Sequence, residues 1–90
     1  MSKELYVRLI EKYGEDMQCI VAMEEMAELQ KELSKAIRGK QDINHIIEEI
    51  ADVEIMLEQL KLIFRCENAV QEYKLSKLEK TREKLEGDGL

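Results

Sequence analysis

Apolar residues recur every three or four positions through the middle of this chain, and that spacing restricts what it can form. One series comprises Ile46, Ile50, Val53, Leu57, Leu60 and Phe64, and a matching series comprises Ala22, Met26, Leu29, Leu33 and Ala36. Such steps place side chains along one face of an α-helix. The 90 residues include no proline and only 4 glycines, so little interrupts helices. The pattern predicts an all-α protein.

Glycine and polar residues divide the chain into four predicted helices. They span about residues 3–13, 15 or 16–38, 43–65 and 68–85. Gly14 and Gly39 suit the ends of the first two helices. Asp42 is expected to cap the third, and Asn68, with Gln71 three residues later, to cap the fourth. Because short connections join antiparallel neighbours, we expect one domain, residues 1–90, resembling an antiparallel four-helix bundle.

The charge balance and the cysteines exclude several classes of protein. The chain has 20 acidic and 14 basic residues, a net charge of −6. An acidic surface repels phosphate backbones, so no nucleic-acid partner is expected.

No apolar run is long enough for a bilayer or a signal peptide, so we expect no membrane partner and a cytoplasmic protein. Cys19 and Cys66 lack CxxC spacing and histidine partners, and we expect reduced, partly buried thiols.

Two acidic octapeptides repeat one pattern on the two predicted long helices. Ala22–Leu29 reads AMEEMAEL, and Ile46–Val53 reads IIEEIADV. If the helices pack antiparallel through their apolar stripes, acids from both repeats face each other across a groove. The acids predicted to line it are Glu25, Glu28, Glu49 and Asp52. Glu24 and Glu48 are expected to point away from it.

Four carboxylates in one groove repel one another unless a cation lies between them. Hard divalent cations with oxygen ligands are the usual solution, and Mg²⁺ retains waters that leave room for a phosphate. The alternative is that these acids form a solvated flank beside an apolar stripe, as in most amphipathic helices. Glu32, one turn beyond Glu28, is expected either to assist the metal ligands or, more commonly for such an acid, to face solvent.

The segments EEMAEL and EEIADV, with 20 residues between the acidic pairs, resemble the ExxE…ExxD signature of the MazG-like all-α nucleoside triphosphate pyrophosphohydrolases. The resemblance covers about residues 13–65 and, more weakly, the last helix. It implies that Glu25 and Glu28, with Glu49 and Asp52, bind Mg²⁺, for which Mn²⁺ can substitute. It also implies cleavage of a nucleoside triphosphate to a monophosphate and pyrophosphate, with Glu25 or Glu28 orienting or deprotonating the attacking water.

The resemblance also implies basic residues that hold the triphosphate. The family often carries a lysine and an arginine in its last helix, and Lys77 and Arg82 would fill these places. The alternative is an exposed basic stripe paired with Glu79 and Glu83. Lys35, at the end of the second helix, would serve instead, although a cation there also suits the helix dipole.

Further apolar residues lie outside the two stripes and would leave exposed patches on a monomer. They are Ile20, Met23, Ile37, Ile47, Ile55, Ile63 and Leu75. Members of the resembled family form dimers or tetramers, so we expect a homodimer or homotetramer. The expected function is Mg²⁺-dependent hydrolysis of an NTP or dNTP, of the house-cleaning kind. The alternative is a non-catalytic helical module for oligomerisation or metal binding.

Overall fold

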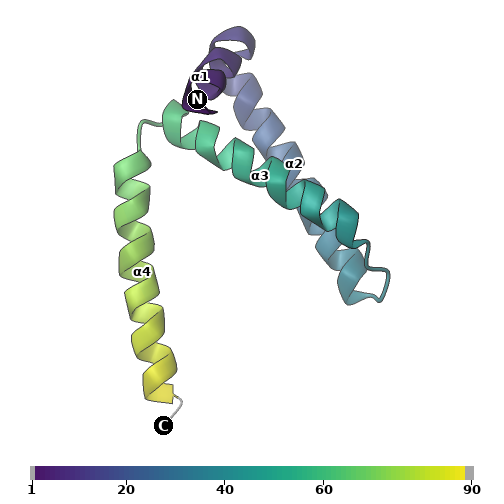
Figure 1. The fold of residues 1–90 in the computed structure, drawn as a ribbon, viewed down its shortest axis with the longest axis vertical. Helices are drawn as coiled ribbons and strands as arrows, with labels where there is room; N and C mark the ends of the chain where they lie inside the picture. Colours follow the sequence, from purple (N-terminus) through teal and green to yellow (C-terminus); the bar gives the residue numbers. More distant parts are fainter. Residues whose placement is uncertain (1, 89–90) are drawn as a thin grey trace.

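The computed structural model describes residues 2–88, and within them it contains four helices and no strand. The helices are α1 (Ser2–Tyr13), α2 (Glu15–Ile37), α3 (Ile43–Ile63) and α4 (Glu67–Asp88). Helices α2 and α3 lie side by side, α1 packs near one end of this pair, and α4 extends away from it (Figure 1). The all-α prediction is confirmed. None of these helices has the length and apolar character needed to cross a bilayer.

The connections before α2 and α3 follow the predicted turn residues. Gly14 and Gly39 have φ angles of 92° and 83°, a left-handed conformation that glycine adopts without steric cost. Asp42 caps α3 as predicted, because its side chain accepts a hydrogen bond of 3.3 Å from the backbone N–H of His45. Local sequence therefore determines where these two helices begin.

The connection between α3 and α4 differs from the prediction. Arg65 has a φ of 52°, a left-handed conformation uncommon outside glycine, and α3 ends before it at residue 63. The carbonyl of Cys66 accepts a 2.9 Å hydrogen bond from the N–H of Val70, so α4 begins earlier than expected. Asn68 consequently lies inside the first turn of α4 rather than at its cap. The helix also continues through Gly87 instead of ending before residue 86.

Helices α2 and α3 form a hairpin, and polar side chains lie along the line where they touch. Three pairs of side chains lie on this line: Gln18 with Gln59, Glu25 with Asp52, and Glu32 with His45. Each step of seven residues forward along α2 is matched by a step of seven back along α3. The prediction that the helices pack through their apolar stripes therefore holds only in part, because these polar side chains share the contact with Ala22, a stripe residue that is 1% exposed.

The apolar stripes of α2 and α3 lie beside this contact line. At about 100° per residue, the stripe of α2 is centred roughly 60° from the line and that of α3 roughly 120° from it. Because the pairs run in opposite order along the two helices, both stripes turn toward the same side of the hairpin. Leu33, Ile50, Leu57 and Phe64 on this side keep 46%, 44%, 43% and 65% of their surface exposed. We call these four residues the apolar face.

The hydrophobic core of one chain is small. Ala22 and Met56 are the only fully buried hydrophobic side chains in the described part of the chain. Most of the residues predicted to lie outside the stripes are exposed, namely Ile20, Met23, Ile37, Ile47, Ile55 and Leu75, whereas Ile63 is half-buried. Cys19 and Cys66 are free and half-buried, as predicted. A single chain therefore leaves much of its apolar surface in water.

Helix α4 contributes little to the packing of the other three. It contacts α3 near the connection between them, and Glu67 in its first turn pairs with Lys3 of α1 at 3.2 Å. From there it runs away from the hairpin (Figure 1). The radius of gyration is 16.5 Å, compared with about 12 Å for a compact domain of this length. The packing of α1, α2 and α3 is compatible with a bundle, but the chain as a whole has an open shape.

Candidate metal centre

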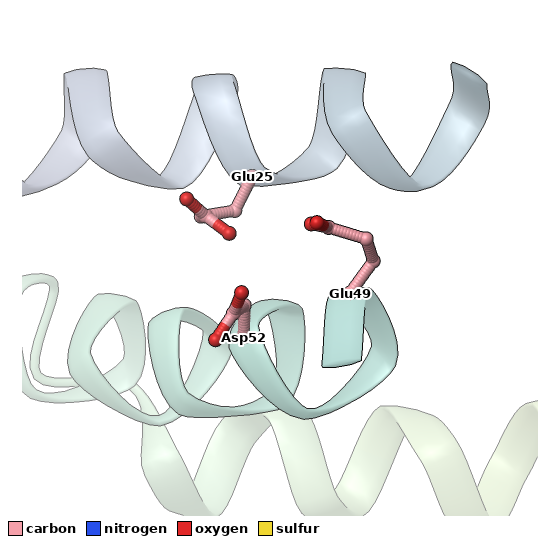
Figure 2. Close-up of side chains that lie close together, drawn as sticks. All are labelled: Glu25, Glu49 and Asp52. Atoms are coloured by element: carbon pink, nitrogen blue, oxygen red, sulfur yellow. The ribbon is translucent and has the colours of Figure 1, made fainter. Parts of the chain in front are cut away.

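Three of the four predicted acids meet at the middle of the hairpin. Glu25 extends from α2, and Glu49 and Asp52 extend from α3 toward it (Figure 2). One carboxylate oxygen from each residue lies within 4.8 Å of the other two. We call Glu25, Glu49 and Asp52 the acid cluster. The two matched repeats therefore meet in space, as the sequence predicted.

The surroundings of the acid cluster disfavour its negative charge. Burial, hydrogen bonding to Asp52 and repulsion from the neighbouring acids raise the pKa of Glu25. Burial, followed by repulsion from Asp52 and Glu28, raises the pKa of Glu49. One oxygen of Glu49, Oε2, is buried and has no hydrogen-bond partner. The cluster thus lacks positive charge and hydrogen-bond donors where both would stabilise it.

Glu28 does not join the acid cluster. Its side chain is exposed, and its charge reaches the cluster only by repulsion that raises the pKa of Glu25 and Glu49. The reason is the helical phase: the contact line passes through Glu25, so Glu28 lies about 60° around α2 from it. Glu24 and Glu48 are exposed, as predicted for the outer members of each pair.

Glu32 is the acid that sequence reasoning placed least well. It is only 6% exposed, rather than facing solvent. Its Oε2 lies 3.4 Å from Nζ of Lys35, and its Oε1 lies 3.9 Å from Nδ1 of His45 with no hydrogen-bond partner. A signal was present in the sequence, because Glu32 follows Glu25 by seven residues, as Glu25 follows Gln18. Gln18 and Gln59, which are buried at the same contact, were not predicted either, because this seven-residue spacing was not used.

The predicted phosphate-binding residues are not gathered around the acid cluster. Arg82 pairs with Glu79 and Glu86 on its own helix. Pairing with Glu79 was expected, but Glu86 takes the place of the expected Glu83. Lys77 is exposed on α4. Among the described helices, α4 packs only against α3, and it is joined to α1 by the ion pair between Glu67 and Lys3. Lys35 lies on α2 with its ammonium group beside Glu32.

A wide groove of the described structure lies away from the acid cluster. It has a volume of about 840 Å³ and runs between α3, α1 and the start of α4. Tyr6 and Phe64 line it, together with Glu54, Glu58 and Lys61. The last three residues lie roughly 180–240° around α3 from the contact with α2. Leu57 and Phe64 of the apolar face line it as well, so the groove extends from the apolar face to the outer side of α3, and no residue of the acid cluster lines it.

Comparison of the chain with family models, with curated proteins and with solved structures produced no match.

Proposed function

We propose that this chain is a Mg²⁺-dependent nucleoside triphosphate pyrophosphohydrolase that converts an NTP or dNTP to the monophosphate and pyrophosphate, in a house-cleaning role. The observation that carries the proposal is the acid cluster, in which Glu25 from one helix meets Glu49 and Asp52 from the next within 4.8 Å. The ExxE…ExxD resemblance to the MazG-like family supports the same reaction.

The residues of the acid cluster fit a hard divalent cation. All three offer carboxylate oxygens, the ligands that Mg²⁺ and Mn²⁺ prefer. Within residues 2–88, no lysine or arginine forms an ion pair with any of the three. The unpartnered oxygen of Glu49 therefore calls for a positive group that the chain does not provide. Glu25, Glu49 and Asp52 would hold the ion.

Bound Mg²⁺ would neutralise phosphate charge and lower the pKa of a water molecule. Glu28 lies outside the acid cluster but close enough to affect its charge, so it is free to accept the proton of the attacking water. Glu25 would then serve the ion rather than the proton transfer. Lys35, which stands on the same helix, would exchange its contact with Glu32 for a phosphate oxygen.

The open shape of the chain supports a homodimer, or a tetramer of two such dimers. The chain has an accessible surface of 7374 Å², whereas a folded monomer of its mass is expected to have about 5,500 Å². A second hairpin packed on the apolar face would complete an antiparallel four-helix bundle from two chains. Two free thiols fit a reducing, cytoplasmic location.

The second candidate is a non-catalytic module that binds a divalent cation and oligomerises. The observation favouring it is that Arg82 is already paired with acids of α4, which leaves Lys35 as the one predicted phosphate-binding residue on the two helices that carry the acid cluster. Incubation with a panel of nucleoside triphosphates and Mg²⁺ separates the two candidates. Pyrophosphate and a monophosphate are expected. Orthophosphate and a diphosphate would refute the proposed reaction, and no product from canonical or modified bases would favour the module.

A further inference from the structure

A polar pair of side chains flanks the acid cluster on each side along the hairpin, and one of these pairs is fully buried. On one side, Nε2 of Gln18 donates a 2.7 Å hydrogen bond to Oε1 of Gln59. These two residues are 6% and 1% exposed. On the other side, the buried carboxylate of Glu32 lies 3.9 Å from His45. Each flanking pair stands seven residues, about 10 Å, from the acids at the centre.

The central acids repel each other when they are ionised, whereas Gln18 and Gln59 are joined by a hydrogen bond. Repulsion from Asp52 contributes to the raised pKa of both Glu25 and Glu49. When they are ionised, this repulsion favours their separation, either by sliding α2 along α3 or by moving the helices apart. The Gln18–Gln59 hydrogen bond resists both movements, because its partners come from opposite helices.

Sliding is costly because the glutamine side chains have few other partners. Gln59 also reaches Sδ of Met56 at 3.6 Å, which is a weak acceptor. A shift of one helical turn, about 5.4 Å, would leave both amides buried without partners, and such groups are costly to bury. The short connection at residues 38–42 does not prevent this shift, since it needs only one turn of α2 or α3 to unwind.

We infer that Gln18 and Gln59 are positioning residues, which hold α2 and α3 in the register that brings the acid cluster together. This inference rests on the proposed function, because it concerns the geometry of that metal site. Neither glutamine needs to touch the ion or the substrate. Metal–ligand distances tolerate changes of only a few tenths of an ångström, so a one-turn shift would disperse the ligands. An apolar pair would bury equally well here but would not select the register.

The test is the double variant Gln18→Leu with Gln59→Leu, which removes both amides and leaves neither unpaired. Gln30→Leu is the matched control, because Gln30 is exposed on the same helix. Spin labels are placed at two exposed positions, Lys31 of α2 and Glu54 of α3, after both native cysteines are changed to alanine. Labelled chains are diluted with unlabelled protein, and the interspin distance is measured by pulsed EPR without metal. The Kd for Mn²⁺ is measured on the same unlabelled variants, with folding checked by circular dichroism.

We expect one narrow distance for the parent and for Gln30→Leu. The double leucine variant should stay folded, shift or broaden this distance by about 5 Å, one turn, and bind Mn²⁺ at least tenfold more weakly. An unchanged distance would overturn the inference, and so would a shifted distance with unchanged Mn²⁺ affinity. If the parent binds no Mn²⁺ while the distance shifts only in the double variant, the register role stands and the proposed function fails.

Discussion

The assembly of the apolar face can be tested with one charge placed at its centre. Leu57 is 43% exposed on the apolar face, and Ile55, two residues away on α3, is 41% exposed. The two side chains lie about 160° apart around the helix. Leu57→Glu and Ile55→Glu therefore add the same charge at equal exposure, but only Leu57→Glu places it where a second hairpin would pack.

The size of the expected effect follows from the surface of the chain. Its 7374 Å² exceeds the expectation for a monomer of this mass by about 1,900 Å². Two chains that covered this excess would bury about 3,800 Å² in total, within the range of obligate dimers. Leu57→Glu would bury two unpaired carboxylates per dimer at roughly 3 kcal/mol each. Association should then weaken by about 10⁴-fold.

Sedimentation equilibrium at micromolar concentration measures this effect. The parent and Ile55→Glu should sediment at twice the 10.6 kDa of one chain, and Leu57→Glu should sediment as a monomer. A parent that sediments at 10.6 kDa with full activity would refute the argument. Dissociation of Ile55→Glu with retention of the Leu57→Glu dimer would show that the chains associate through the outer side of α3 instead.

Four further predictions concern the acids. In calorimetry, Mg²⁺ or Mn²⁺ should raise the melting temperature of the parent and should raise that of Glu49→Gln much less. Without metal, Glu49→Gln should be at least as stable as the parent, and a lower stability would indicate a structural ion pair instead. At pH values between the ordinary pKa of 4.5 and the raised pKa values of Glu25 and Glu49, the folded chain binds more protons than the unfolded chain. The contribution of these two groups to the metal-free unfolding free energy should therefore rise as pH falls through that window. Urea titrations should show this rise diminished in Glu49→Gln, and an identical slope in both proteins would contradict it. Alanine at Glu25 or Glu49 should abolish pyrophosphate release, whereas alanine at Glu48 should retain most of it; equal losses would refute the assigned helical phase. Glu28→Gln should lower kcat at least about 100-fold while changing the Kd for Mn²⁺ less than threefold, and a parallel loss of both would make Glu28 a ligand.

The helices themselves could be predicted because their signals are local. The spacing of apolar residues, the side chain of Asp42 and the left-handed glycines act within a few residues of the ends that they determine. The break at Arg65 could not be predicted, since its φ of 52° is unusual for a residue that carries a side chain. The direction of α4 depends on packing that one local segment does not encode.

The acid cluster could be predicted in part, and the errors in that prediction have a single cause. Equivalent angles on two repeats correctly brought Glu25 together with Glu49 and Asp52. The prediction assumed that the largest apolar stripe forms the contact within the hairpin, since burial of apolar surface stabilises folds most. In the structure the contact passes through Gln18, Glu25 and Glu32 instead, so Glu28 is exposed and Glu32 is buried. Attention to the seven-residue spacing of Gln18, Glu25 and Glu32 would have corrected both.

The polar contact and the apolar face are two consequences of one arrangement. A hairpin that buried its apolar stripes between its own helices would gain stability alone, but its acids would then lie outside the contact. Here Ala22 is the one stripe residue that is fully buried, Ile50 and Leu57 on one side of the hairpin stay exposed, and the acids of both helices meet at the contact. Hydrophobic burial is the main term stabilising a small domain, so the chain must recover it elsewhere. Its own α4 borders only part of this face, and Leu57 and Phe64 stay exposed beside it. Association of two hairpins would restore that burial without displacing the acids, so the metal site and the dimer would form from the same helices without competing for the same side chains.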